Sequence, residues 1–131
     1  MSGAPGGSWR ALVAGGALVL AAGVALGAVA SHAAGRAAHP EAARLLQVAV
    51  LYQLVHGIAL VLAGTLARSG SSRWLGLAGA AFAAGVALFC GSLYWLAFTG
   101  TSAGILAPLG GSALIAGWIL LAVHALAGGR G

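Results

Sequence analysis

The sequence predicts an all-α integral membrane protein, a four-helix bundle with both termini on the cytoplasmic side. Hydrophobic residues make up 61% of the 131 residues and charged residues only 5%, which leaves too little polar surface to cover a water-soluble globule. Four long apolar runs have no charged side chain in their interiors, and each is long enough to cross a bilayer as a helix. We therefore expect one small membrane domain rather than a soluble, fibrous or disordered chain.

The four helices are expected at residues 11–32, 43–67, 74–98 and 105–127, within a single transmembrane domain that covers residues 1–131. A helix rises about 1.5 Å per residue, so about 20 apolar residues cover the hydrocarbon core. The last two runs are separated by a turn of small polar residues, 99–104. Lipid does not solvate such a turn, so we place it at an interface.

The first run also has features of a signal peptide, because Arg10 precedes it and Ala28-Val29-Ala30 before Ser31 offers a small-residue cleavage site. Its apolar stretch is longer than a usual signal core. We therefore expect it to remain as a membrane helix.

Helix start and stop residues punctuate the loop between the first two runs. Gly35 suits the left-handed conformation that ends a helix, and Pro40 suits the first turn of the next. Glu41, the only acidic residue, is three residues before Arg44, a spacing that favours a local ion pair on one helix face.

The distribution of arginine predicts the orientation. Four crossings put both termini and the middle loop on one side with Arg10, Arg68, Arg73 and Arg130, whereas the other side holds Arg36 and Arg44. By the positive-inside rule the arginine-rich side faces the cytoplasm.

Small residues recur at helical spacing on three of the expected helices. Lipid provides no hydrophobic drive for helices to associate, so close backbone contact along small residues is the expected source of cohesion. The positions that we expect to pack helix against helix are Gly16, Gly23, Gly27, Gly91, Gly110, Gly111 and Gly117.

The second helix differs because polar side chains share one of its faces. Tyr52, Gln53 and His56 are within about one turn of each other, and an amide and an imidazole in hydrocarbon each need hydrogen-bond partners. Tyr52 is placed to be a partner of His56. A satisfied interhelical polar cluster, a ligand or proton site, and exposure to lipid are the three alternatives.

Several function classes are excluded. Six scattered arginines and no lysine make no stripe for nucleic acid, and one cysteine, Cys90, cannot form an internal disulfide. The histidines expected within or near the spans, at 32, 56 and 124, differ in depth by roughly 8 Å or more, too far for a shared haem, and no group has metal-ligand spacing. With a single carboxylate and no nucleophile beside a base, we expect neither an enzyme nor a cofactor.

Four ordered motifs resemble a known family. They are Gly27-Ala28 followed by His32, Tyr52-Gln53 with His56, Phe89-Cys90-Gly91-Ser92-Leu93-Tyr94, and Pro108-Leu109-Gly110-Gly111 with Gly117-Trp118. Together they resemble the YgdD-like small membrane proteins, the domain of unknown function 423 family, over most of the chain. The resemblance implies a four-helix protein of the bacterial inner membrane with no established activity. Ser31, Gly57, Cys90 and Ala107 depart from the family's usual residues, each as one small residue for another.

The family-like polar residues are expected mostly in the outer half of the membrane, where we expect them to converge on one interhelical cluster. The candidate members are His32, Tyr52, Gln53, His56, Ser92 and Tyr94. The expected function is that of a non-catalytic accessory subunit that docks onto a larger membrane complex, with energy metabolism as the expected setting, or that forms a homo-oligomer among membrane lipids. The alternatives are small-molecule or lipid binding and transport through the polar cluster, and the handling of a quinone or haem.

Overall fold

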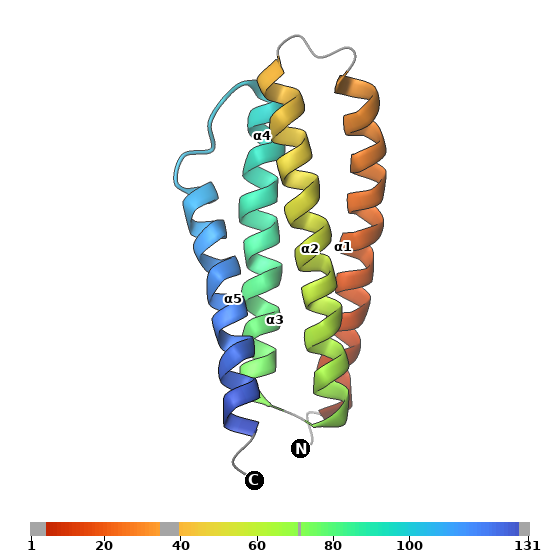
Figure 1. Ribbon diagram of the computed structural model, residues 1–131, viewed down its shortest axis with the longest axis vertical. Coiled ribbons are helices and arrows are strands. Elements are labelled where there is room, and N and C mark those ends of the chain that lie inside the picture. Colours follow the sequence, from red (N-terminus) through yellow and green to blue (C-terminus); the bar gives the residue numbers. More distant parts are fainter. Residues whose placement is uncertain (1–4, 35–39, 71, 129–131) are drawn as a thin grey trace.

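The computed structural model describes residues 5–34, 40–70 and 72–128, and these residues are helical apart from short connections (Figure 1). The elements are α1 (Pro5–Ala34), α2 (Pro40–Ser69), α3 (Arg73–Gly85), η1 (Val86–Cys90), α4 (Gly91–Thr99) and α5 (Leu106–Gly128). α3, η1 and α4 follow one another without a break and are here called the third span. Four helices are long and apolar enough to cross a membrane: Ser8–His32, Glu41–Ser69, Arg73–Thr99 and Leu106–Gly128. The predicted all-α, four-span fold is confirmed.

Proline and glycine mark several helix ends. α2 begins at Pro40, as expected, and α1 begins at Pro5, ahead of the expected start at residue 11; proline in a first turn loses no hydrogen bond, because that N–H has no partner within the helix. Gly100 ends α4 in the left-handed conformation, with φ 71°, and its N–H donates to the carbonyl of Leu96 at 2.8 Å. Gly35 lies outside the described residues, so its role as a helix stop stays a prediction.

Short polar contacts occur at both ends of the bundle. Arg44 Nη2 lies 2.9 Å from Glu41 Oε1, which confirms the predicted ion pair. At the other end, the Ser72 hydroxyl accepts a hydrogen bond from the Trp74 N–H at 3.2 Å and so caps α3. The same hydroxyl lies 3.1 Å from His124 Nδ1, which ties the end of α5 to the start of α3.

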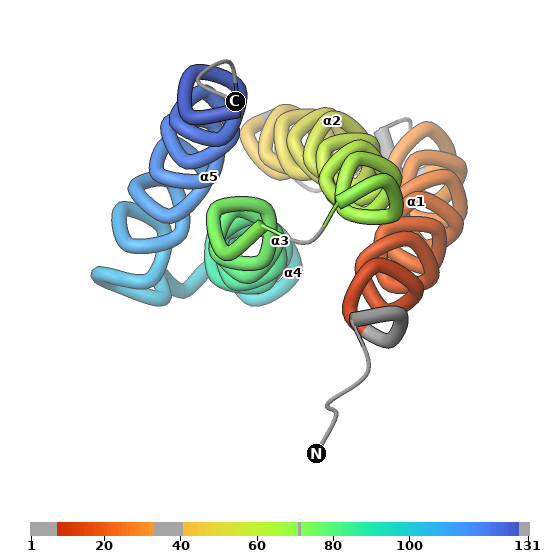
Figure 2. Tube along the Cα trace, turned by 90° about the horizontal axis from the view of Figure 1, so that it is seen from below, coloured from red at the N-terminus to blue at the C-terminus, as the bar shows by residue number. Residues whose placement is uncertain are grey.

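The helices form a curved row rather than a square. Figure 2 shows α1 and α5 at opposite edges, with α2 and the third span between them. α1 packs along α2, α2 packs along the third span, and α5 packs along α3 and η1. The start of α1, the α2–α3 connection and the end of α5 lie at the same end of the bundle (Figure 1). Which side of the membrane this end faces stays a prediction.

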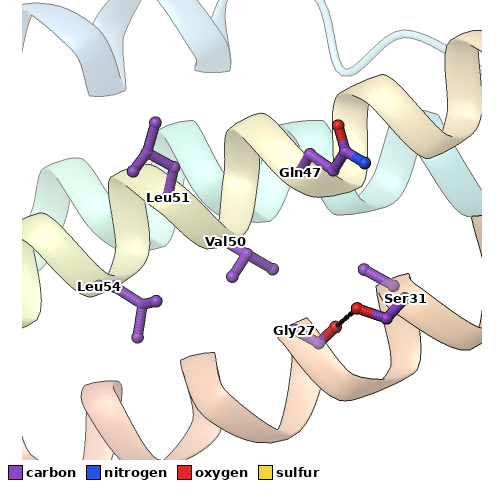
Figure 3. A pocket seen from close by; sticks show the side chains of 7 residues that line it. Gly27, Ser31, Gln47, Val50, Leu51 and Leu54 are labelled. Atoms are coloured by element: carbon purple, nitrogen blue, oxygen red, sulfur yellow. Dashed lines mark hydrogen bonds between the residues drawn. The ribbon is translucent and has the colours of Figure 1, made fainter.

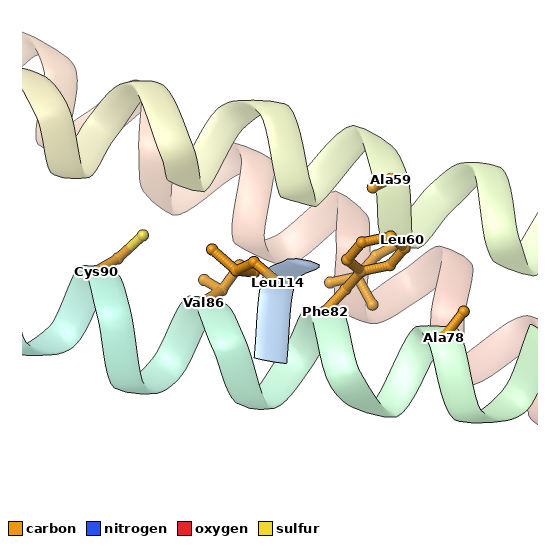
Figure 4. Close-up of a cluster of buried hydrophobic side chains, with 7 residues drawn as sticks. All are labelled: Ala59, Leu60, Ala78, Phe82, Val86, Cys90 and Leu114. Carbon is orange, nitrogen blue, oxygen red and sulfur yellow. The ribbon is translucent and has the colours of Figure 1, made fainter. Parts of the chain in front are cut away.

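The core lies between α2, the third span and α5. The third span directs Phe82, Val86 and Cys90 toward α2 (Figure 4). Phe82 is fully buried, and Leu114 of α5 joins the same cluster. The remaining members are Ala59, Leu60 and Ala78. Both α2 and the third span contribute small and large side chains to this cluster.

A short π-helical segment, η1, interrupts the third span. The inward-facing residues Ala78, Phe82, Val86, Cys90 and Tyr94 are four residues apart, and all belong to or pack against the core. In a regular α-helix, with 3.6 residues per turn, a four-residue spacing drifts around the axis by about 40° at each step. The wider turn of a π segment takes up the surplus. The π turn therefore offsets part of this drift between Val86 and Cys90.

Predicted packing glycines of α1 lie against α2. A Cβ atom at Gly16 would lie 2.9 Å from the Gly57 carbonyl oxygen and 2.8 Å from Val61 Cγ2. A Cβ atom at Gly23 would lie 2.8 Å from Leu54 Cδ2. Contacts of this length are too short for any side chain, so these glycines set the distance between α1 and α2.

Two glycines of α5 act in the same way against the third span. A Cβ atom at Gly110 would collide with the backbone nitrogen of Phe89, and one at Gly117 would lie 2.5 Å from the ring of Phe82. The approach at Gly110 involves backbone on both sides. It therefore leaves less room for adjustment than a contact with a flexible side chain.

The other predicted packing glycines are less constrained. Cβ atoms at Gly27 and Gly111 would make ordinary contacts, at 3.4 Å to Val50 Cγ1 and 3.8 Å to Phe89 Cδ2. Gly91 does not pack helix against helix within the chain, because it is exposed and a Cβ atom there would meet nothing within 4 Å. Gly91 lies on the face of the third span that points away from the bundle.

We predict that Gly110→Ala destabilises the protein by about 1–3 kcal/mol, because the added methyl group displaces backbone. The matched control is Gly91→Ala, for which we expect no loss and a gain of up to about 1 kcal/mol from helix propensity. Unfolding of both variants in detergent micelles, followed by circular dichroism, measures the difference. Equal stabilities of the two variants would contradict the close contact at Gly110.

Candidate functional site

Gln53 of α2 joins three helices through its side-chain amide. Its Oε1 accepts a hydrogen bond from the Tyr94 hydroxyl of α4 at 2.7 Å, and its Nε2 donates to the carbonyl oxygen of Val19 in α1 at 3.0 Å. Gln53 is only 6% exposed. Because a buried amide without partners is costly in an apolar environment, these two bonds fix the positions of α1 and α4 relative to α2.

His56, one turn further along α2, makes a second set of hydrogen bonds. The indole Nε1–H of Trp118 in α5 donates to His56 Nε2 at 3.0 Å. An indole nitrogen only donates, so His56 Nε2 accepts and the ring hydrogen is on Nδ1. His56 Nδ1 then donates to the carbonyl oxygen of Tyr52 at 2.8 Å.

Both ring nitrogens of the buried His56 are therefore occupied by partners within the chain. If the ring hydrogen of His56 were on Nε2, that N–H and the indole N–H would point at each other as two donors without an acceptor. A ligand or metal ion would reach Nε2 only if Trp118 moved away. The arrangement suits a structural imidazole whose ring nitrogens bond to partners within the chain.

Aromatic rings surround His56. The Tyr52 ring is stacked with the imidazole at a centroid distance of 5.8 Å, and the Phe82 and Trp118 rings each lie 5.9 Å away. The Tyr52 ring also contacts Phe89 at 4.8 Å. The expected contact between Tyr52 and His56 is present, but it consists of ring stacking and the backbone carbonyl rather than the phenol hydroxyl.

A groove lies beside this aromatic group, between α2 and α5. Its volume is about 370 Å³, and Tyr52 and Trp118 on its walls are each 41% exposed. The other lining residues are His56, Phe89, Gly111, Leu114 and Ile115. Within the described part of the chain, the Tyr52 hydroxyl has no hydrogen-bond partner. It is the polar group that this groove offers to a molecule from the membrane.

The other two candidate residues lie apart from these bonds. The buried Ser92 donates to the carbonyl oxygen of Phe89 in its own helix at 2.8 Å. His32 is exposed near the end of α1 and makes no hydrogen bond with the described residues. The structure thus brings together Tyr52 with His56, and Gln53 with Tyr94, but not His32 or Ser92. A functional role for any of the six stays a prediction.

A second groove lies between the C-terminal part of α1 and the N-terminal half of α2 (Figure 3). It has a volume of about 340 Å³ and is lined by apolar side chains together with Ser31 and Gln47. The Ser31 hydroxyl turns back to the carbonyl oxygen of Gly27 at 3.1 Å. The exposed amide of Gln47 makes no hydrogen bond with the described residues. Gln47 therefore remains the open polar group of this groove.

Sequence reasoning missed Trp118 and Gln47 as members of polar sites. An indole N–H near the middle of an apolar helix needs an acceptor, and His56 is the side chain at similar depth that provides one. The signal for Gln47 is an uncharged amide inside an expected span, where unpaired polar groups are rare. The motif Gly117-Trp118 contains Trp118 but does not indicate its bond to His56.

The helices and their internally bonded polar core define a small multi-pass membrane protein. A family model described as "Protein of unknown function (DUF423)" matches residues 26–111. The chain belongs to this DUF423 family. The matched range includes Gln53, His56 and Tyr94 but ends before Trp118.

Named relatives are membrane proteins as well. A UPF0382 membrane protein of Haemophilus influenzae is 36% identical over 100 residues, which are 76% of this chain and 80% of that protein. UPF0382 membrane protein SH2409 of Staphylococcus haemolyticus is 34% identical over 109 residues, or 82% of this chain and 88% of that protein. No solved structure matches the chain.

We predict that the Gln53–Tyr94 hydrogen bond appears as a coupling energy of about 0.5–2 kcal/mol in a double-mutant cycle of Gln53→Leu and Tyr94→Phe. The measurement is the free energy of unfolding in mixed micelles. As a control, Gln53→Leu and Trp118→Phe, which touch separate bonds, are expected to be additive within about 0.5 kcal/mol. Additivity of Gln53 and Tyr94 would show that their bond does not form.

We also predict that nitrogen NMR of the labelled protein finds the His56 hydrogen on Nδ1. Trp118→Phe removes the donor to Nε2 and is expected to change the Nε2 resonance. Trp95→Phe removes an exposed indole elsewhere and is expected to leave that resonance unchanged. A hydrogen on Nε2 in the unaltered protein would refute the assigned bond.

Proposed function

We propose that this protein is a non-catalytic accessory subunit of the bacterial inner membrane that docks onto a larger membrane complex, with its termini in the cytoplasm. The observation that supports it best is an outward-facing surface of small residues on the third span. Exposed members of this surface are Gly76, Ala80, Ala83, Ala84, Ala87 and Gly91. Apart from the adjacent Ala83 and Ala84, neighbouring members are three or four residues apart, which keeps them on one face of the helix.

This outer face differs from the glycine contacts inside the bundle. Gly79 and Gly85 of the same span are buried against Leu12 and Leu114, whereas Cβ atoms at Gly76 and Gly91 would meet open space. Small residues that no helix of the chain covers suit the close approach of a further helix. One face of the third span thus packs within the bundle, and the opposite face can pack against a helix of a partner.

A groove between α1 and the third span extends this surface. It has a volume of about 330 Å³ and includes Gly15, Ala83 and Ala87. The other lining residues are Ala11, Leu12, Val19, Leu60 and Val86. Every one of these side chains is apolar, so the groove fits an apolar helix better than a polar ligand.

The hydrogen bonds of the polar residues favour docking over transport. Gln53 and His56 form hydrogen bonds with partners within the chain. A transport path requires polar groups that can exchange partners with the cargo. The second candidate function, binding of a small molecule or lipid, is favoured by one observation, the free Tyr52 hydroxyl in the α2–α5 groove.

We predict that Ala83→Leu disrupts the assembly while leaving the bundle folded, because the larger side chain fills the groove. An overpacked contact costs about 1–3 kcal/mol, which lowers the affinity for the partner by about fivefold to about 150-fold. The measurement is the size of the tagged chain's assembly after solubilisation in mild detergent, by native electrophoresis.

Ala116→Leu is the matched control, because Ala116 is an exposed alanine on α5, away from the groove. We expect it to keep the assembly intact. If the unaltered protein is a monomer with full cellular function, the docking proposal fails. Such a monomer with a small lipid bound in the α2–α5 groove would support the second candidate.

A further inference from the structure

Two arginines share one tryptophan at the end of the bundle that holds the start of α1 and the end of α2. The guanidinium carbons of Arg10 and Arg68 each lie 5.5 Å from the centre of the Trp9 ring. This distance is within the range of cation–π attraction. The two guanidinium groups are therefore at most twice that distance apart, although they come from different helices.

A backbone contact between α1 and α2 sets this arrangement. A Cβ atom at Gly64 would lie 2.9 Å from the carbonyl oxygen of Trp9 and 2.9 Å from the backbone nitrogen of Val13. The absence of a side chain at Gly64 thus lets α1 lie directly on α2. Arg68 is one helical turn beyond Gly64 on the same face, and so it reaches the indole.

No acidic side chain balances these charges. The chain has one acidic residue, Glu41, and it is paired with Arg44 at the opposite end of the bundle. Arg10 and Arg68 are exposed and make no hydrogen bond or ion pair with the described residues. Each guanidinium offers five N–H donors, and two like charges held near one ring attract an anion.

The position of the group selects the kind of anion. The first and second candidate spans begin and end at Ser8 and Ser69, so Trp9, Arg10 and Arg68 lie where the apolar part of the bundle ends. Tryptophan is enriched at this level of a bilayer, and lipid phosphates lie there at high local density. Guanidinium groups bind phosphate oxygens in a bidentate fashion, which ammonium groups do not.

We propose that Trp9, Arg10 and Arg68 form a binding site for the phosphodiester headgroup of an anionic phospholipid. The two guanidinium groups bind the phosphate oxygens, and the indole holds both side chains in place and lies against the glycerol region of the lipid. This site is separate from the small-residue surface on the third span, and it does not depend on the docking function.

The test is native mass spectrometry of the purified protein, titrated with phosphatidylglycerol and with phosphatidylcholine of the same acyl chains. We expect the unaltered protein to prefer phosphatidylglycerol. Near a membrane, one arginine contributes about 1 kcal/mol to such binding, which corresponds to about fivefold in affinity. R10Q and R68Q are each expected to lose about fivefold, and the double variant most of the preference. W9L keeps both arginine charges and is expected to lose part of the preference for phosphatidylglycerol.

R44Q is the matched control, because it removes the same charge from the opposite end and is expected to keep the preference. A loss in R44Q equal to that in R10Q would show that net charge alone attracts the lipid and would overturn the site. No preference in the unaltered protein would overturn it too. Displacement of the lipid by millimolar inorganic phosphate would identify a free-anion site instead. Circular dichroism of each variant checks that the helices remain intact.

Discussion

The bundle depends on two polar side chains of one helix. Gln53 and His56 are one turn apart on α2, and together they bond to α1, α4 and α5. In water, burial of apolar surface would hold such helices together, but lipid tails are as apolar as the side chains and supply no such drive. Hydrogen bonds between helices therefore contribute to which helices associate and how they are oriented. Glycines such as Gly16 and Gly110 allow the close contacts between helices. The hydrogen bonds of Gln53 and His56 favour one arrangement of the helices.

The third span shows how one helix serves several neighbours. Its inward residues recur every four positions, and the π turn at Val86–Cys90 offsets part of the rotation that this spacing causes in a regular helix. The same turn brings the backbone of Phe89 against Gly110, so a local change in winding is coupled to the packing of α5. The outward face of the third span is lined with exposed alanine and glycine.

The sequence predicts the spans and several internal contacts well, because composition and helical spacing are local properties. The ion pair of Glu41 with Arg44 follows from a separation of three residues, and the glycines at 16, 23, 110 and 117 follow from the need for close packing in lipid. The partner of His56 was not predictable in this way. Trp118 is 62 residues away in sequence, and the rotation of α5 that aims its indole at the imidazole is set by the contacts of Gly110 and Gly117. The π turn was missed because a four-residue repeat also occurs on regular helices. His32 and Ser92 are polar and at suitable depth, but their rotation around the helix axis directs them elsewhere.

The edge position of α1 allows the bundle to assemble stepwise. α1 packs chiefly on α2, through Gly16, Gly23 and Gly64, whereas α5 completes the other edge. The two helices made first can thus associate as a hairpin in the membrane before the remainder of the chain is synthesised. At that stage the Gln53 amide nitrogen has its acceptor on Val19, while its oxygen still awaits Tyr94. The hydrogen bond that this oxygen accepts from Tyr94 favours association of the third span with the hairpin in the register that brings the two residues together.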